Sequence, residues 1–445
     1  MMMADDTICA ISTALGGAVS IVRVSGPEAE KNCGRLWHGR TSLGEIRARE
    51  LALGRLSSVD GELIDPQCLA VRMPGPHSYT GEDVVELQCH GGALCARLAL
   101  EALLKVGCHL AEPGEFTKRA FLNGRMDLTQ AEAVADLIGA GSEAALRLAG
   151  RHLEGRLGER IRALHGTVSD VLAEVTSRLD FPEEELDWRE PQDMMNGLAA
   201  VQSELAELLR TRREGEVLRG GLSLVIIGPP NAGKSSLLNH LLGRDRAIVT
   251  DIPGTTRDTI EASLTIRGIP LRLMDTAGIR DGGDVVEQAG MTRARDCAEA
   301  ADLVIWLADA TRPLTEQTIP SWNFRGVVLS VINKMDLAAV DCGEAIPISV
   351  KTGGGMEELY DAVENAVWSD HHENHDEVAV AARHAGLLEE AGAAVRRAAE
   401  RIAEETWELA AVDLRTAVAA LGRITGQSVE PDVLGAIFSK FCIGK

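Results

Sequence analysis

The segment GPPNAGKSS, residues 228–236, decides the fold of the middle of the chain. It has the pattern GxxxxGK[ST] and follows the apolar run LSLVIIG (222–228), which is typical of a buried parallel strand. Glycines let backbone N–H groups curl around phosphates, Lys234 supplies positive charge to the outer phosphates, and the Ser235 hydroxyl can bind Mg²⁺. The segment therefore predicts a P-loop that joins a strand to a helix and binds a nucleotide.

Four further motifs follow in the order typical of GTP-binding proteins: DIPGTTRD (251–258), DTAG (275–278), NKMD (333–336) and SVK (349–351). Thr256 is placed to complete Mg²⁺ coordination and to sense the γ-phosphate. Asp275 would hold the metal through water, and the N–H of Gly278 would contact the γ-phosphate. Asn333 and Asp336 can read the guanine edge, with Asp336 accepting hydrogen bonds from N1 and the exocyclic amine. This pair indicates GTP rather than ATP.

The residue after DTAG departs from the common GTPase pattern. Many GTPases have a glutamine there that orients the attacking water, whereas this chain has Ile279, whose aliphatic side chain cannot do so. Either hydrolysis is negligible, or a polar residue in 279–290 orients the water, and Glu287 is the best-placed candidate. Asn231 in the P-loop either tolerates the tight turn or offers its carbonyl to a monovalent cation, which would supply the charge of an arginine finger.

Composition limits the class of protein. The length of 445 residues predicts about three domains. Lys and Arg number 45 against 67 Asp and Glu, which gives a net charge of −22. This charge excludes a generally basic protein that coats nucleic acid. It does not exclude a nucleic-acid substrate that is bound at a local patch or delivered by a partner protein. Nine cysteines with no CxxC pair suit reduced thiols. With no signal peptide and no apolar run near ~18 residues, we expect a cytoplasmic protein that does not enter membranes.

Changes in sequence pattern predict four segments: an α+β domain at 1–122, the first part of a helical domain at 123–216, an α/β GTPase domain at 217–370, and the second helical part at 371–445. Apolar residues recur every three or four positions from Leu153 to Leu179, which predicts one long amphipathic helix. Thr129 and Glu132 have the spacing of a capping box. Because helical sequence flanks the α/β segment, we expect a GTPase domain inserted into a discontinuous helical domain.

Two short segments outside the nucleotide motifs invite a chemical interpretation. HHENH (371–375) has metal-ligand residue types, but it lies among acidic residues at a predicted domain junction, so we expect no structural metal there. FCIGK (441–445) places Cys442 near the end, but Gly444 and Lys445 fit a prenylation box poorly. Cys442 is either a buried structural cysteine or a thiol that the tail carries into another domain, where Lys445 would favour the thiolate.

Together these features resemble the MnmE (TrmE) family of tRNA-modification GTPases. The resemblance rests on the nucleotide motifs and the helical flanks, and on FCIGK, VRVSG (22–26), YTGEDVVELQCHGG (79–92) and EPGEFTKRAFLNGRMDLTQAEAVADLI (112–138). Many GTPases share the nucleotide motifs, whereas the N-terminal blocks and FCIGK are far more specific.

The resemblance implies an activity and its participants. The N-terminal domain would bind a tetrahydrofolate derivative (the 5,10-methylene or 5-formyl form) and form a homodimer, and the helical domain would carry the GTPase. With the flavoprotein MnmG, in a heterotetramer or larger complex, the protein would add a (carboxymethyl)aminomethyl group to carbon 5 of the wobble uridine of certain tRNAs. Folate would supply the one-carbon unit, and the partner would supply most of the basic surface for tRNA.

The resemblance also assigns roles to residues of this chain. The implied folate-binding residues are Arg23, Glu86, Arg125 and Lys445. The implied K⁺ ligands are Asn231, Thr250, Ile252 and Thr255, beside Ser235 and Thr256 for Mg²⁺. The implied catalytic residues are Glu287, which orients water, and Cys442, which acts in the modification. With the motifs, the GTP-binding set becomes Asn231, Ala232, Gly233, Lys234, Ser235, Ser236, Thr250, Asp251, Ile252, Pro253, Gly254, Thr255, Thr256, Asp275, Thr276, Ala277, Gly278, Asn333, Lys334, Asp336, Ser349, Val350 and Lys351.

Two other classes of function share part of these features. A regulatory or ribosome-assembly GTPase would have the five nucleotide motifs but no reason for FCIGK or for the block at 79–138. A one-carbon-transfer protein in which GTP only gates the folate site would keep both. Nucleoside analysis of tRNA from cells that lack the protein separates the modification enzyme from these two.

Overall fold

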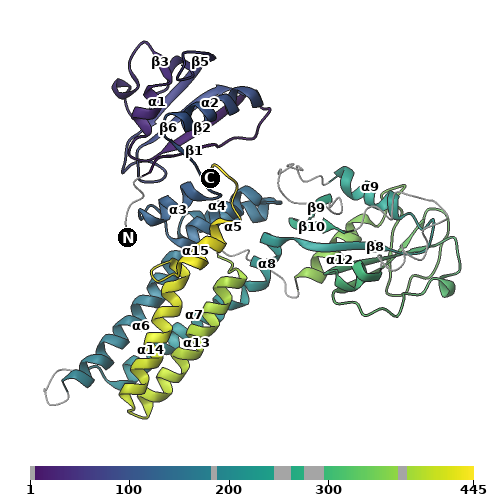
Figure 1. Ribbon diagram of the computed structural model, residues 1–445. Helices are drawn as coiled ribbons and strands as arrows, with labels where there is room; N and C mark the ends of the chain where they lie inside the picture. The colour runs from purple at the N-terminus through teal and green to yellow at the C-terminus, as the bar shows by residue number, and fades with distance from the viewer. Residues whose placement is uncertain (1–5, 182–187, 245–261, 275–294, 369–377) are drawn as a thin grey trace. The chain divides into compact units, whose positions relative to one another are not determined.

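The computed structural model describes residues 6–181, 188–244, 262–274, 295–368 and 378–445. Backbone contacts divide the chain into two units (Figure 1). The first unit comprises Met1–Ala135, His152–Gln202 and Leu387–Lys445, and the second comprises Asp136–Arg151 and Ser203–Gly386. The three boundaries between the four segments drawn from sequence pattern stay a prediction.

A seven-stranded sheet forms the N-terminal part of the first unit, in the order β3-β4-β5-β6-β2-β1-β7. Its strands are β1 (Ile8–Ile11), β2 (Val19–Ser25), β3 (Trp37–Gly39), β4 (Ala52–Ser57), β5 (Leu63–Met73), β6 (Val84–His90) and β7 (His109–Leu110). Only the β1–β7 pairing is parallel among these. The helices here are α1 (Ala29–Gly34), α2 (Ala93–Lys105) and α3 (Glu115–Leu122). Helix α2 packs on the sheet over a core that includes Val22, Leu87 and Leu103.

The first unit also contains, in whole or in part, the helices α4 (Leu128–Gly139), α6 (Arg156–Asp180), α7 (Pro191–Arg210), α13 (Ala382–Ala403), α14 (Trp407–Thr425) and α15 (Pro431–Phe438). Helix α5 (Glu143–Leu153) belongs to the second unit except for its last two residues. Helix α14 lies along α6, whose apolar stripe from Leu157 to Val175 is buried as predicted (Figure 1). The prediction that this helix already includes Leu153 was wrong, because Gly155 adopts φ +93° and separates α5 from α6. No helix among the described residues is long and apolar enough to cross a bilayer.

The start of α4 corrects a second expectation. The capping box consists of Asp127 and Gln130 rather than Thr129 and Glu132: the Gln130 N–H donates to Asp127 Oδ1 at 3.0 Å, and the Asp127 N–H donates to Gln130 Oε1 at 3.0 Å. Thr129 lies inside the helix and donates its hydroxyl to Asp127 at 2.6 Å. An aspartate two residues earlier therefore replaces the threonine as the cap.

A six-stranded sheet forms the core of the second unit, in the order β13-β12-β11-β8-β10-β9. Its strands are β8 (Leu222–Ile227), β9 (Ala262–Ile266), β10 (Ile269–Leu273), β11 (Leu303–Asp309), β12 (Val327–Asn333) and β13 (Ile346–Pro347). All neighbours pair in parallel except the β9–β10 hairpin. The helices α8 (Arg212–Gly220), α9 (Lys234–Arg244) and α12 (Met356–Val367) belong to this α/β part, where strands and helices alternate as predicted.

Candidate functional site

The P-loop connects β8 to α9, where the sequence predicts it. Gly228 adopts φ +153°, and a Cβ there would lie 2.1 Å from the carbonyl oxygen of Leu307, so only glycine fits beside β11. Asn231 adopts φ +65°, a left-handed conformation that asparagine tolerates better than most residues. The tight-turn role of Asn231 is therefore confirmed, and its K⁺ role stays a prediction.

Lys234 lies under this loop at the start of α9. Its ammonium group donates to the carbonyl oxygens of Gly228 and Pro229, each at 3.0 Å. Burial lowers the pKa of the Lys234 ammonium. Ser235 and Ser236 follow in the first helical turn, whose N–H groups and positive dipole end attract phosphate.

Asn333 links the P-loop to the last nucleotide motif. Its Nδ2 donates to the carbonyl oxygen of Ala232 at 2.8 Å, and its Oδ1 accepts from the Val350 N–H at 3.1 Å. Asp336 is oriented by Ser349, whose hydroxyl donates to Asp336 Oδ1 at 2.7 Å. Motifs that are far apart in the sequence thus form one hydrogen-bonded group at the carboxyl ends of β8 and β12.

A cavity of about 640 Å³ lies at this group. It is lined by Gly233, Ser236, Asn239, His240, Asn333, Lys334, Asp336, Leu337, Val350 and Lys351. Seven of these ten residues are in the predicted GTP-binding set. Asn239, His240 and Leu337 were missed, although the four-residue spacing of Ser236 and His240 on α9 places both on one helix face.

Asp309 is a further residue that the motifs do not reveal. Its carboxylate Oδ2 lies 2.6 Å from Lys334 Nζ, and Oδ1 accepts from the N–H and the hydroxyl of Thr311. Burial opposes ionisation, but the hydrogen bonds from Lys334 and Thr311 and the charge of Lys334 together outweigh it and hold the pKa of Asp309 below its usual value. Because Asp309 ends β11, it fixes Lys334 at the rim of the cavity.

The remaining predicted nucleotide residues lie outside the described part of the chain. They are Thr250, Asp251, Ile252, Pro253, Gly254, Thr255, Thr256, Asp275, Thr276, Ala277 and Gly278, with Ile279 and Glu287 of the hydrolysis argument. HHENH (371–375) also lies outside it. Their roles stay predictions.

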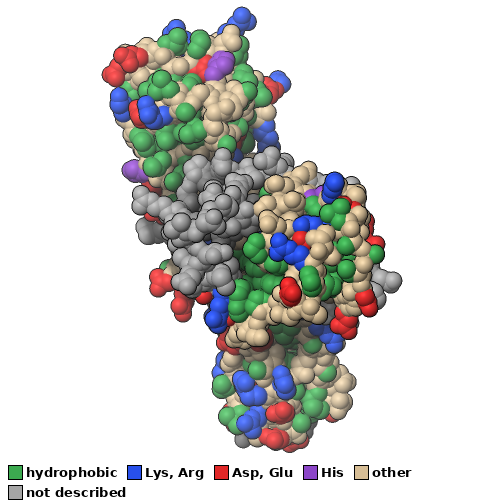
Figure 2. Space-filling view, turned by 90° about the vertical axis from the view of Figure 1, so that its right-hand side faces the viewer, with side chains coloured by type: hydrophobic (Ala, Val, Ile, Leu, Met, Phe, Trp, Pro, Cys, Tyr) green, Lys and Arg blue, Asp and Glu red, His purple; other side chains and the backbone are tan. Residues whose placement is uncertain are grey.

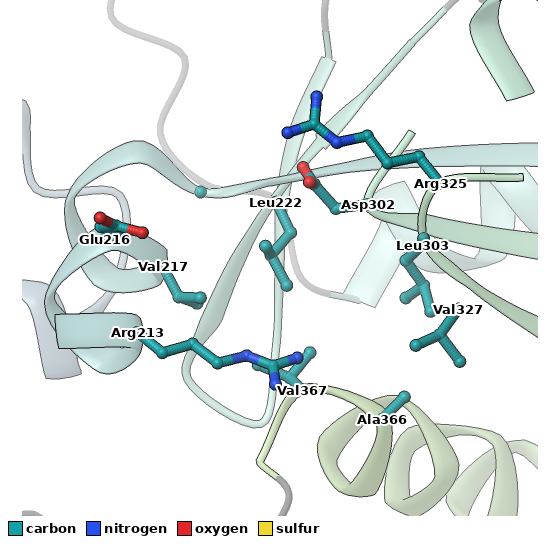
Figure 3. Close-up of a pocket in the computed structure, with 12 residues that line it drawn as sticks. Arg213, Glu216, Val217, Leu222, Asp302, Leu303, Arg325, Val327, Ala366 and Val367 are labelled. Carbon is teal, nitrogen blue, oxygen red and sulfur yellow. The ribbon is translucent and has the colours of Figure 1, made fainter. Parts of the chain in front are cut away.

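A second cavity of the same unit, about 510 Å³, lies at the opposite ends of the strands (Figure 3). Leu222, Leu303 and Val327, which begin β8, β11 and β12, line it together with Arg213 of α8. Parallel α/β sheets bind ligands at the carboxyl ends of their strands, and none of the nucleotide motifs lines this cavity. The cavity beside the P-loop is therefore the candidate nucleotide site.

In the N-terminal sheet, Arg23 of β2 and Glu86 of β6 are cross-strand partners. The Nε and Nη2 atoms of Arg23 both lie 2.8 Å from Glu86 Oε1. The guanidinium also lies over two aromatic rings, 5.5 Å from the Tyr79 centroid and 5.7 Å from that of Phe116. The structure thus brings together two predicted folate residues and adds two aromatic neighbours that sequence reasoning missed.

Arg125 is connected to the same region through the loop that carries Tyr79. Its Nε donates to the Ser78 carbonyl oxygen at 3.1 Å, and its side-chain carbons lie close to Gly81. Arg23 and Arg125 therefore both contact the segment 78–82, and Glu86 is linked to it through Arg23. Lys445, the fourth, is half-buried, with no contact that joins it to the other three among those described.

The segment FCIGK leaves α15 and reaches the N-terminal sheet. Ile443 forms an antiparallel bridge with Pro113, and the Gly114 N–H donates to the Cys442 carbonyl oxygen at 3.4 Å. Gly444 is packed so closely on Ile11 of β1 that a Cβ would lie 2.4 Å from the Ile11 carbonyl oxygen. The Cys442 side chain is exposed, which excludes the buried structural cysteine as an account of this tail.

The charged side chains on the face in Figure 2 are interspersed: Lys and Arg lie singly among Asp and Glu, without a broad basic field among the described residues. Non-specific attraction to a polyanion needs such a field. This face therefore agrees with the acidic composition of the chain.

Comparison with known proteins identifies the family. The family described as "GTP-binding protein TrmE N-terminus" matches residues 7–125, and the family described as "MnmE helical domain" matches residues 128–442. The chain is 44% identical over 449 residues to a protein of Akkermansia muciniphila named tRNA modification GTPase MnmE, covering 99% of both chains. It is 43% identical to the protein of that name from Syntrophotalea carbinolica, with both chains fully covered.

The chain belongs to the MnmE family of tRNA modification GTPases. The resemblance drawn from the motifs is thereby confirmed, and so is the P-loop GTPase among its parts. Among solved structures, the FeoB G-domain of Methanococcus jannaschii is 25% identical, covers 34% of this chain and 98% of its own, and has a TM-score of 0.25. So low a score adds nothing to the sequence match.

For this MnmE-family chain, Asp336→Asn is expected to weaken GTP binding by about 1.5–3 kcal/mol, roughly 10- to 150-fold, because a charge-assisted hydrogen bond to the base is lost. Titration with a fluorescent GTP analogue measures this. Asp341→Asn, in an exposed turn of the same unit, is the matched control and should leave the affinity unchanged. Equal GTP affinities for the unaltered protein, Asp336→Asn and Asp341→Asn would contradict the role of Asp336 in guanine binding.

Proposed function

We propose that the chain hydrolyses GTP to support the addition of a (carboxymethyl)aminomethyl group to carbon 5 of the wobble uridine of certain tRNAs, together with the flavoprotein MnmG. A tetrahydrofolate derivative supplies the one-carbon unit. In this proposal the GTPase domain is inserted into a discontinuous helical domain, the N-terminal domains form a homodimer, and Ser235 and Thr256 hold Mg²⁺.

The observation that carries the proposal is the contact of the FCIGK tail with the N-terminal sheet. Gly444 packs on Ile11, and Ile11 pairs with Val22, the residue before Arg23. The exposed Cys442 thiol is therefore attached to the same small sheet that carries the Arg23–Glu86 pair. A GTPase that acts only as a switch has no use for a thiol placed there.

The chemistry around Arg23 supports a folate as the ligand. A pterin is a flat ring with N–H donors, so it can stack on Tyr79 and donate to Glu86, because an ionised carboxylate accepts several hydrogen bonds. Arg23 holds that carboxylate in place. Arg125 and Lys445 add positive charge that suits the glutamate tail of the cofactor.

Nucleoside analysis tests the proposed function. Bulk tRNA from a strain without the gene should lack the modified wobble uridine, and a plasmid copy should restore it. A copy with Lys234→Ala, which removes the P-loop ammonium, should fail to restore it. Unchanged tRNA nucleosides in the deletion strain would favour the alternative, a regulatory or ribosome-assembly GTPase.

The proposal includes a K⁺ ion held by Asn231, Thr250, Ile252 and Thr255, and Glu287 as the residue that orients water. We expect faster GTP hydrolysis in KCl than in NaCl at equal ionic strength, because the ion adds charge where the transition state develops it. Glu287→Ala should slow turnover by about 100-fold and leave GTP affinity nearly unchanged.

Single-turnover assays in both salts measure these effects, and Asn231→Ala should reduce the preference for K⁺. Equal rates in the two salts would contradict the cation model. An active Glu287→Ala protein would contradict only the residue assignment.

A further inference from the structure

Three sulfur atoms and one buried carboxylate lie close together in the N-terminal sheet. Asp65 and Cys68 belong to β5, Cys89 belongs to β6, and Cys95 lies in the first turn of α2. Leu69 pairs with Gln88, which places the neighbouring Cys68 and Cys89 side by side. Because side chains alternate along a strand, Cys89 points to the opposite face of the sheet from Glu86. The cluster is therefore separate from the proposed folate site.

The spacing of these atoms matches the ligand shell of a small tetrahedral ion. The ligand atoms of Asp65, Cys89 and Cys95 all lie within 4.8 Å of one another. Cys95 Sγ lies 3.7 Å from Asp65 Oδ2, and Cys68 Sγ lies 3.8 Å from Cys89 Sγ. Two thiolates each about 2.3 Å from Zn²⁺ in a tetrahedral site are about 3.8 Å apart.

The Asp65 carboxylate is buried and held by hydrogen bonds, as carboxylates that ligate metals usually are. Asp65 is 1% exposed, and a carboxylate so deeply buried must be paired or bind a cation. It accepts from the N–H of Gln67 at 2.9 Å and from the N–H of His90 at 2.7 Å, and His90 Nδ1 lies 2.9 Å from Oδ1. Hydrogen bonds of this kind orient the carboxylates that ligate metals.

We propose that Asp65, Cys89 and Cys95 bind a thiophilic divalent cation of the Zn²⁺ class, with Cys68 beside them as the fourth donor. Cys95 is only partly buried, which gives the ion a path from solvent. Thiolate ligands favour Zn²⁺ over Mg²⁺, which prefers carboxylate, carbonyl and water oxygens. The ion would join β5, β6 and the start of α2.

Cobalt and zinc test this directly on the full-length, reduced protein. Co²⁺ should produce a thiolate charge-transfer band and the intense visible bands of a tetrahedral site, and one equivalent of Zn²⁺ should bleach them. Cys95→Ala should abolish both signals. His90→Ala, which removes only a partner of Asp65, should lower zinc affinity about 10- to 100-fold in a chelator competition. Cys33→Ala is the control, because Cys33 is a buried thiol of α1 in the same hydrophobic core but outside the cluster.

An alkylation experiment on the unaltered protein keeps the test independent of folding defects. Zn²⁺ should protect Cys95 from iodoacetamide, as read by peptide mass spectrometry, and leave the exposed Cys442 reactive. A cobalt spectrum without thiolate bands, equal loss of binding in Cys33→Ala, or unchanged alkylation of Cys95 would each overturn the proposal.

Discussion

Cys442→Ser is expected to abolish the modified wobble nucleoside and to leave GTP hydrolysis near normal. The physical reason is that the tail is held by groups other than the thiol. Phe441 is buried, Ile443 pairs with Pro113, and Gly444 packs on Ile11, whereas the Cys442 side chain is exposed. Serine keeps the size of this side chain and removes its nucleophilicity at neutral pH.

Complementation of a deletion strain followed by nucleoside analysis measures the first effect, and phosphate release by the purified protein measures the second. Cys342→Ser, a partly buried thiol of the other unit, is the matched control and should restore the nucleoside. If Cys442→Ser were insoluble, or lost GTP hydrolysis to the same degree, the thiol would have a structural role instead. A fully active Cys442→Ser protein would exclude it from the chemistry.

Arg119→Met is expected to destabilise the N-terminal sheet by ~3–5 kcal/mol, because it leaves the largely covered carboxylates of Glu82 and Glu115 without their counter-charge. The Arg119 side chain is 5% exposed, and its guanidinium bonds Asp6 and Glu115 at 2.8 Å and Glu82 at 3.3 Å. Glu82 also accepts from Ser25 at the end of β2. The network therefore connects α3 to the segment that carries Tyr79 and to the strand that carries Arg23.

Hydrogen exchange of peptides from β2 and β6 measures this loss for the sheet itself, and protection should fall by about 100-fold or more. Arg147→Met is the control, since the Arg147–Glu143 pair is exposed and worth about 1 kcal/mol at most. Protection equal to that of the control would contradict the expected role of Arg119.

The pH dependence of the same network follows from Asp6. Burial opposes ionisation, but the hydrogen bond from Arg119 holds the pKa of Asp6 below its usual value. A lowered pKa in the folded state contributes stability at neutral pH that is lost as the pH falls below about 4. Arg119→Met should lack this part of the acid sensitivity.

Several parts of the structure could be predicted because local chemistry determines them. The P-loop requires glycine at position 228, because the Leu307 carbonyl oxygen of β11 leaves no space for a Cβ there. The glycine in the motif therefore indicates this close approach. The apolar stripe of α6 reflects burial of one face of that helix, and the continuous apolar run of β8 reflects burial of both faces of that strand. Such patterns are read from neighbouring residues alone.

Other features depend on residues that are distant in sequence. Lys334 belongs to a known motif, but its partner Asp309 ends a different strand, and only the pairing of β11 with β12 brings them together. The cap of α4 was misassigned because Thr129 fits the motif as well as Asp127, and the bonds decide between them. The aromatic rings around Arg23 come from two further segments, which no local spacing could indicate.

The tail contact has a consequence for the order of events during synthesis. A ribosome completes β1, β7 and α3 long before it makes residues 441–444, yet these residues cover Ile11, Pro113 and Gly114. Domains that form early during translation usually become complete before later ones emerge. Here the surface formed by Ile11, Pro113 and Gly114 stays exposed to solvent until the helices α14 and α15 and the segment after them have been synthesised. Each new molecule thus acquires the proposed reactive thiol only after residues 1–441 have been translated.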